Sequence, residues 1–181
     1  MKNSVSVKTN MNLIKEYNGK VFYGVPSEKA FKREKPDANL ENSDNTYNNA
    51  QILQLMEFGS PINNIPPRKL LEPVLKKYNA QIQKHLDLVI QAILAGEKDV
   101  ADNLMEKLAL RVQNWCKLFF TDEDNNWQPN SPITIYGGWM RNKVSGKPIY
   151  IKGKGSDKPL IDTGSLRSSV SAFFSEDNID E

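Results

Sequence analysis

Residues 70–120 read LLEPVLKKYNAQIQKHLDLVIQAILAGEKDVADNLMEKLALRVQNWCKLFF. Apolar side chains recur there at intervals of three and four residues, a spacing typical of amphipathic helices. One apolar stripe covers 70–93, a second covers 100–119, and Gly96 separates them. Asp99 is suited to cap the second helix. Two long helices joined by a short turn pack antiparallel, so this stretch predicts an antiparallel helix pair.

Strand signals flank this helix pair near both ends of the chain. Residues 20–25, KVFYGV, combine β-branched and aromatic side chains and stop at Pro26. A second strand is expected over 168–175, and the residues on one of its sides are Val170, Ala172 and Phe174. A short helix over 49–58 should end at Gly59. The expected fold class is α+β: a small, mostly antiparallel sheet packed against the pair of long helices, with extended loops.

Length and composition favour one domain spanning 1–181. No apolar run approaches the ~20 residues of a membrane span, and the start of the chain lacks the apolar centre of a secretion signal. We therefore expect no membrane partner and synthesis in the cytoplasm. Cys116 is the single cysteine and His85 the single histidine. Neither an internal disulfide nor a Cys/His metal cluster is expected within one chain.

Three segments are poor in core-forming residues or biased in charge. They are an exposed polar loop over 27–49, a basic hairpin over 136–152 and an acidic tail over 175–181. The formal net charge is only +2, but no acidic residue occurs between Asn125 and Ser156. The basic residues in that interval are Arg141, Lys143, Lys147, Lys152 and Lys154. We expect these segments to engage neighbouring molecules.

A catalytic dyad of His85 with Cys116 or a serine is disfavoured. His85 lies between the apolar stripe residues Ile82 and Leu86, which predicts a boundary or surface histidine. Cys116 follows Trp115 on a helix and is interpreted as a small buried hydrophobic residue. No catalytic residue is expected, and the protein is predicted not to be an enzyme.

Two further segments are candidates for ligand sites. The acidic run 122–124 lacks the spaced oxygen ligands of a calcium loop and is interpreted as a solvated turn. Residues 152–156, KGKGS, lack the spacing of a phosphate-binding P-loop. They are interpreted as a flexible basic turn, with weak, salt-sensitive contact to DNA phosphates as the alternative. No metal or cofactor is expected.

Three motifs occur in a consistent order along the chain. The first runs from Asn48 through MEFGSP (56–61) to IPPRKLLEP (65–73), the second is WQPNSPITI (127–135), and the third is PLIDTGSLRSSV (159–170). Together they resemble the tailed-bacteriophage virion-morphogenesis family of neck, head-tail connector and tail-completion proteins. The motif residues are Glu57, Phe58, Gly59, Pro66, Pro67, Arg68, Leu160, Asp162, Thr163, Gly164, Leu166 and Arg167.

The chain departs from this pattern in two places. Lys69 stands where the family commonly has a second proline, and 136–150 looks like an insertion before the third motif. No role transfers from the family to that inserted hairpin.

The motifs also have local physical interpretations. Asp162 or Thr163 can cap a helical turn, and Gly164 permits a turn that other residues would strain. Leu166 is expected in the core, with Arg167 outside as a partner for a carboxylate.

The first motif has a similar interpretation. Residues 57–59 should end a short helix against the same sheet, and the prolines at 66–67 should stiffen the entry to the long helix.

The resemblance implies a structural virion protein of the head-to-tail junction, whether neck, tail terminator, tail-completion or collar protein. It implies a homo-oligomeric ring around the DNA channel, made in the host bacterial cytoplasm and located in the virion. The implied partners are other copies of the chain, other neck, portal-side, tail-tube or sheath proteins, and DNA passing through the lumen without sequence readout. The alternative is a soluble phage DNA-binding accessory protein that uses the basic segment 141–158.

Overall fold

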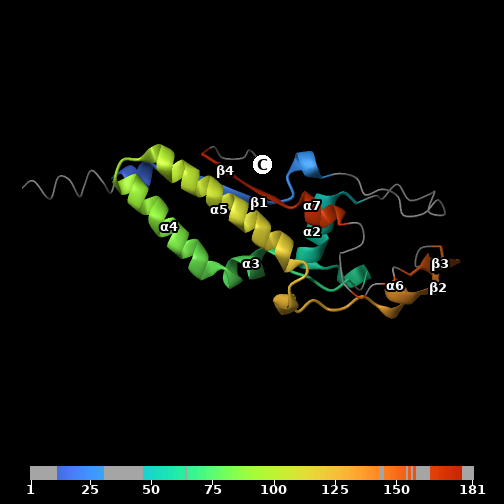
Figure 1. The fold of residues 1–181 in the computed structure, drawn as a ribbon. Coiled ribbons are helices and arrows are strands. Elements are labelled where there is room, and N and C mark those ends of the chain that lie inside the picture. Colours follow the sequence, from blue (N-terminus) through green and yellow to red (C-terminus); the bar gives the residue numbers. More distant parts are fainter. Residues whose placement is uncertain are drawn as a thin grey trace, which may run out of the picture.

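A computed structural model describes residues 12–30, 47–63, 65–142, 145–153, 155, 157 and 164–176. The fold is α+β, as predicted. Two long helices lie side by side, a two-stranded sheet runs along one of them, and a second small sheet stands at the far end of the molecule (Figure 1).

The antiparallel helix pair is formed by α4 (Asn79–Leu94) and α5 (Lys98–Phe119). The predicted first helix is divided in two, because α3 (Leu71–Lys77) ends at Tyr78, whose φ is −102° and ψ 14°. The Tyr78 ring stacks on Trp115 of α5 with centroids 4.4 Å apart. The apolar spacing continues through Tyr78, so periodicity alone did not reveal this break.

The start of α5 also differs from the prediction. Glu97 occupies the N-cap position without a side-chain hydrogen bond, and Asp99 lies inside the first turn. A carboxylate there still favours the helix start, because it faces the positive end of the helix dipole.

The sheet that covers α5 joins the two ends of the described chain. Strand β1 (Lys20–Gly24) pairs antiparallel with β4 (Ser171–Ser175), with Tyr23 opposite Ala172. Residues 168–170 were predicted as strand, but α7 (Ser165–Ser169) occupies most of that stretch. Leu166 and Val170 are both buried, and their spacing of four residues buries them through a helical turn instead of strand alternation.

A second, separate sheet consists of the predicted hairpin. Helix α6 (Pro132–Tyr136) leads into β2 (Gly137–Arg141), which pairs antiparallel with β3 (Pro148–Lys152). In the ribbon view, α6 and this hairpin lie at the opposite end of the molecule from the turn between α4 and α5 (Figure 1).

The remaining elements are short. Helix α2 (Asn49–Phe58) begins with a capping box formed by Asn48 and Gln51. Single 3-10 turns are η1 (Ser27–Lys29), η2 (Pro61–Asn63) and η3 (Glu123–Asn125), and a helical turn covers 12–16. Of the predicted loop over 27–49, residues 31–46 lie outside the described residues, as do 177–181 of the acidic tail.

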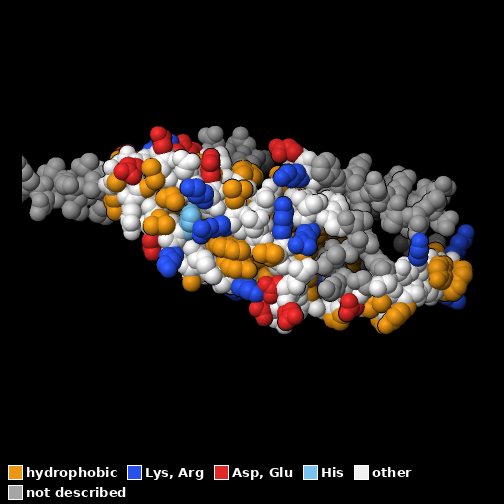
Figure 2. Space-filling model, viewed as in Figure 1, with side chains coloured by type: hydrophobic (Ala, Val, Ile, Leu, Met, Phe, Trp, Pro, Cys, Tyr) orange, Lys and Arg blue, Asp and Glu red, His pale blue; other side chains and the backbone are white. Residues whose placement is uncertain are grey.

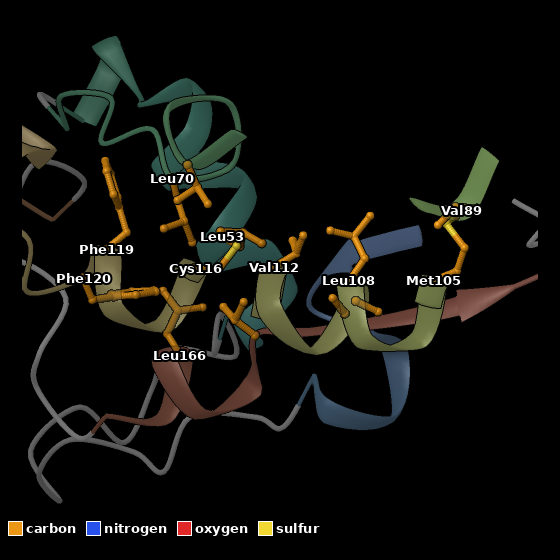
Figure 3. Close-up of a cluster of buried hydrophobic side chains, with 14 of the residues drawn as sticks. Leu53, Leu70, Val89, Met105, Leu108, Val112, Cys116, Phe119, Phe120 and Leu166 are labelled. Atoms are coloured by element: carbon orange, nitrogen blue, oxygen red, sulfur yellow. The ribbon is translucent and has the colours of Figure 1, made fainter. Parts of the chain in front are cut away.

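The hydrophobic core lies around α5, which contacts α3, α4, β1 and β4. Figure 3 shows side chains from α5 meeting those of α2, α4 and α7. The buried residues of α5 are Ala101, Met105, Leu108, Ala109, Val112, Cys116 and Phe119. Because α5 is covered on several sides, it is the helix about which α3, α4, β1 and β4 are organised.

Candidate functional site: a motif joint and a basic hairpin

The first and third motifs meet in space although they are far apart in the sequence. The buried amide of Asn49, at the start of α2, donates a hydrogen bond to Ser165 Oγ of α7 at 3.0 Å, across 116 residues of sequence. Leu53 of α2 and Leu166 of α7 belong to the same buried cluster (Figure 3). We call this region, residues 48–63 and 65–71 with 127–128 and 164–170, the motif joint.

Glu57 caps a helix that begins 14 residues after it. Its Oε1 accepts hydrogen bonds from the backbone N–H groups of Leu70 (2.6 Å) and Leu71 (2.9 Å). Helix α3 has no capping side chain of its own at Leu70, so the Glu57 carboxylate satisfies amides that the helix leaves unpaired. Sequence reasoning assigned Glu57 only to the end of α2. No spacing rule links a carboxylate to a helix start so far away.

Gly59 allows the chain to turn back between α2 and α3. Its φ is +69° and its ψ −174°, a region that essentially only glycine occupies. A Cβ atom there would lie 2.8 Å from the Ile65 carbonyl oxygen and 2.9 Å from the Pro67 nitrogen. The predicted helix end at Gly59 is therefore confirmed. Phe58 is exposed, Pro66 is half-buried and Pro67 is exposed.

Arg68 connects the first motif to the second. Its Nε and Nη2 both donate to the Gln128 carbonyl oxygen, at 3.1 and 3.0 Å, and burial lowers the pKa of its guanidinium. Trp127 Nε1 donates to the Lys69 carbonyl oxygen at 2.9 Å. Only the backbone of Lys69 is used in this bond, so a proline in its place would keep the same acceptor.

The acidic run after α5 pairs with a lysine. Lys77 Nζ lies 2.6 Å from Asp122 Oδ2 and 2.8 Å from Asp124 Oδ2. These contacts raise the pKa of Lys77 and lower that of Asp122. Within the described ranges, no three His, Cys, Asp or Glu side chains are grouped to hold a metal ion.

The described part of the third motif begins at Gly164, which occupies the N-cap position of α7. The prediction that Asp162 or Thr163 caps this turn is therefore wrong, because the N-cap residue has a φ of +70°, a conformation that glycine adopts without strain. Leu166 is buried in the core, and the Ser169 hydroxyl donates to its carbonyl oxygen at 2.7 Å. Arg167 is half-exposed, and no carboxylate among the described residues pairs with it. The motif residues Leu160, Asp162 and Thr163 lie outside the described residues.

His85 and Cys116 do not form a dyad. His85 is 5% exposed, so its prediction as a boundary or surface residue is wrong. Its Nε2 lies 2.7 Å from the Leu104 carbonyl oxygen, which satisfies the ring nitrogen inside the core. Leu104 and Cys116 are twelve residues apart on α5, about 18 Å along the axis at 1.5 Å per residue. Cys116 is fully buried as predicted, and burial, with a smaller contribution from the Glu57 charge, raises its pKa to about 12.

The strands β2 and β3 of the basic hairpin have two different faces. Residues paired across the strands share a face, and Trp139 is paired with Tyr150. These two side chains are 71% and 60% exposed, and their rings meet edge to face with centroids 5.5 Å apart. Arg141 and Lys152 lie on the same face and are also exposed. We call these four side chains the outer face. Basic and hydrophobic side chains appear together at this end in Figure 2.

The inner face holds the hairpin against α6. Gly138 lies opposite Ile151 on this face, and a Cβ at Gly138 would be 3.7 Å from Ile133 of α6. The Gly155 N–H donates to the Ile135 carbonyl oxygen at 2.9 Å. At Gly137, a Cβ would come within 2.6 Å of the Gly153 nitrogen, so only glycine permits this approach. The hairpin is therefore seated on α6 and not on the main core.

Three of the five predicted basic residues lie within the part of the chain that the structure describes. Arg141, Lys147 and Lys152 are exposed, and none has an ion-pair partner within the part of the chain that the structure describes. Lys143 and Lys154 lie outside the described residues.

A shallow groove of about 480 Å³ lies over the β1–β4 sheet. Phe22 and Phe173 stack there with centroids 5.6 Å apart, and Lys29 Nζ donates to Ser171 Oγ at 3.1 Å. The lining residues are Phe22, Tyr23, Gly24, Val25, Pro26, Ser27, Glu28, Ser171 and Phe173. These residues offer an aromatic pair and a few hydroxyl groups without a nucleophile and base in contact.

No protein-family model, no curated protein and no solved structure matches this chain. None of the helices in the described ranges is both long enough and apolar enough to cross a membrane.

Proposed function

We propose that this protein is a structural subunit of a tailed-phage particle, located at the head-to-tail junction. It assembles there as a homo-oligomeric ring around the DNA channel and contacts other neck, portal-side, tail-tube or sheath proteins. DNA passes through the lumen without sequence readout, and the subunit performs no catalysis. It is made in the host bacterial cytoplasm and resides in the virion.

The observation that carries this proposal is that the first motif of the resemblance is hydrogen-bonded to each of the other two. Asn49 reaches Ser165, Arg68 reaches Gln128, and Glu57 caps α3. The residues that resemble the phage family therefore act together as one joint in this fold, as expected of a family signature that determines structure. A subunit whose role is assembly needs such a joint to hold its outer segments in place.

The test is removal of the gene from the parent phage. Electron microscopy of the lysate should show DNA-filled heads and separate tails, and a plasmid copy of the gene should restore joined particles. Normal, infectious particles in the absence of the protein would contradict the proposed function.

The second candidate is a soluble DNA-binding accessory protein acting through the basic segment 141–158. It is favoured by the exposed positions of Arg141, Lys147 and Lys152, which lack ion-pair partners among the described residues. Purified protein titrated with duplex DNA at rising salt separates the two functions. Strong binding by the monomer with a steep salt dependence would favour this candidate, because each neutralised phosphate releases counterions.

A further inference from the structure

The outer face of the basic hairpin has the composition of a protein contact. Trp139 and Tyr150 form a mutually packed aromatic pair, with Arg141 on one side of it and Lys152 on the other. Tryptophan, tyrosine and arginine are the residues most enriched where binding energy concentrates in protein interfaces. Neither cation has an ion-pair partner among the described residues. A matching surface would present apolar side chains between two carboxylates.

The exposed side of α4 presents that complementary pattern. Asp87, Ile90 and Leu94 follow one another at intervals of three and four residues, so they share one helix face. Ile90 is 41% exposed and Leu94 37% exposed. Glu97 follows in the turn to α5, and the side chains of Asp87 and Glu97 are exposed without ion-pair partners among the described residues. We call these four residues the acceptor stripe.

From this complementarity we propose that the outer face of the basic hairpin docks on the acceptor stripe of a neighbouring copy. Closed rings require a heterologous contact, in which one surface of a subunit meets a different surface of the next. The hairpin and the α4–α5 turn lie at opposite ends of the molecule, so the contact joins two chains (Figure 1). This inference rests on the proposed ring and identifies the two surfaces that build it.

The charged residues are also separated by similar distances on the two surfaces. Arg141 and Lys152 lie on cross-strand pairs four residues apart, about 13 Å at the rise of a β-strand. Asp87 and Leu94 are seven residues apart, about 10 Å at the rise of an α-helix, and Glu97 lies beyond the helix end. The aromatic pair therefore falls on Ile90 and Leu94 when the two cations meet the two carboxylates.

The hairpin is held rigidly on α6, which favours binding through its outer face. The approach of Gly137 to Gly153 and the bond from Gly155 to Ile135 fix the hairpin on α6 before any partner arrives. A preorganised surface loses less conformational entropy on binding.

Duplex DNA fits the same face less well. The bases of a duplex are stacked inside the helix, so Trp139 and Tyr150 would lack an aromatic partner there. The described outer face carries two cations, so it would neutralise few phosphates and gain little of the electrostatic affinity on which duplex binding depends.

The experiment is a charge swap measured by sedimentation velocity and native mass spectrometry of the full chain. The hairpin variant combines Arg141→Glu with Lys152→Glu, and the stripe variant combines Asp87→Lys with Glu97→Lys. Each variant alone places like charges across the contact and should weaken self-association at least about tenfold. A mixture of the two should recover mixed oligomers with equal amounts of both, because each contact between a hairpin variant and a stripe variant joins opposite charges.

Matched controls carry charge reversals away from both surfaces. Lys147→Glu lies in the turn of the same hairpin, and Glu123→Lys lies in η3, and both side chains are exposed. Both controls should associate as the wild type does. Circular dichroism checks that every variant is folded.

Each other outcome overturns the contact. If the wild type forms rings and both charge-swap variants form them equally well, the ring is supported but the outer face and the acceptor stripe do not form its contact. If the mixture does not recover association, the two surfaces do not meet. If the hairpin variant loses binding to a single-stranded or duplex oligonucleotide while self-association is unchanged, the outer face is a nucleic-acid surface. If the wild type stays monomeric at every attainable concentration, the proposed ring fails together with the contact.

Discussion

The motif joint and the basic hairpin use their polar and aromatic side chains in opposite ways. In the joint, Asn49, Glu57 and Arg68 each bond to another part of the same chain. On the outer face of the hairpin, Trp139 and Tyr150 contact each other and are otherwise largely exposed. The polar residues of the motif joint therefore hold distant parts of the fold together, whereas those of the outer face are exposed.

This comparison predicts that core residues of the joint dominate stability. Leu70→Ala should lower the free energy of unfolding by about 2–5 kcal/mol, because Leu70 has no exposed surface and its loss leaves a cavity. Urea denaturation of the purified protein measures the change. Leu110→Ala is the control, since Leu110 is exposed on α5, and it should shift the free energy by less than about 0.5 kcal/mol. Equal losses in the two variants would contradict the assignment of the core.

Gly59 and Gly146 provide a matched pair between the two regions. Both have positive φ, at +69° and +67°, but a Cβ atom would come within 3 Å of other backbone atoms only at Gly59. Gly146→Ala should cost about 1–2 kcal/mol for its backbone conformation. Gly59→Ala should cost about 1–3 kcal/mol more, because the methyl group also collides with Ile65 and Pro67. Equal losses of unfolding free energy in the two variants, measured by thermal and urea unfolding, would contradict this prediction.

The buried thiol of Cys116 predicts how the core responds to alkaline pH. Its pKa is raised to about 12 in the folded protein, so the unfolded chain loses this proton first as pH rises. Stability contributed by the neutral thiol is complete below the unfolded pKa near 9 and is lost toward pH 12, with a slope of up to about 1.4 kcal/mol per pH unit. Urea denaturation at several pH values should show a shallower alkaline loss in Cys116→Ala. If the unfolding free energy of Cys116→Ala falls with pH as steeply as that of the wild type, the Cys116 thiol does not cause the alkaline loss.

The cap supplied by Glu57 predicts a smaller loss. Glu57→Ala should destabilise the protein by about 1–2 kcal/mol, because the amides of Leu70 and Leu71 lose their acceptor. Glu57→Gln should recover part of this loss, since an amide oxygen still accepts hydrogen bonds. Glu123→Ala is a control at an exposed position. A Glu57→Ala variant as stable as that control would show that the Glu57 cap does not stabilise the motif joint.

The smallest effect on folding is expected on the outer face of the hairpin. The double variant Trp139→Ala/Tyr150→Ala should change the free energy of unfolding by less than about 0.5 kcal/mol per site, because both rings are mostly exposed. Trp127→Ala, in contrast, removes a ring that packs edge-on against Phe119 and Phe120 and should destabilise clearly. Differential scanning calorimetry compares the three proteins. A large loss in the double variant would place the hairpin in the core instead.

Local patterns predicted much of the fold. The apolar spacing located α4 and α5, the β-favouring run located β1, and the turn residues located the hairpin within a few residues. Each of these signals is read from neighbours in sequence, because helices and strands repeat over a few residues. The break at Tyr78 was missed for the same reason. The backbone angles change there, but the apolar spacing continues, so the sequence pattern does not reveal the break.

Burial of polar groups was the least predictable part of the site. His85 was expected near the surface, yet the Leu104 carbonyl oxygen lies 2.7 Å from its Nε2 and makes burial acceptable. A polar side chain is buried where a partner is available, and the partner of His85 lies on another helix. The same holds for the buried Asn49, whose hydrogen bond to Ser165 spans 116 residues.

Residue patterns along the chain were enough to predict the α+β class, the antiparallel helix pair and the charge and aromatic content of the hairpin. Tertiary structure alone decided that Glu57 caps α3, that Arg68 reaches Gln128, and that Trp139 and Tyr150 face solvent together. The physical reason is that side-chain periodicity reports which face of an element is apolar. It carries no information on which distant donor meets which acceptor, because that choice depends on how the packed backbone brings the elements together.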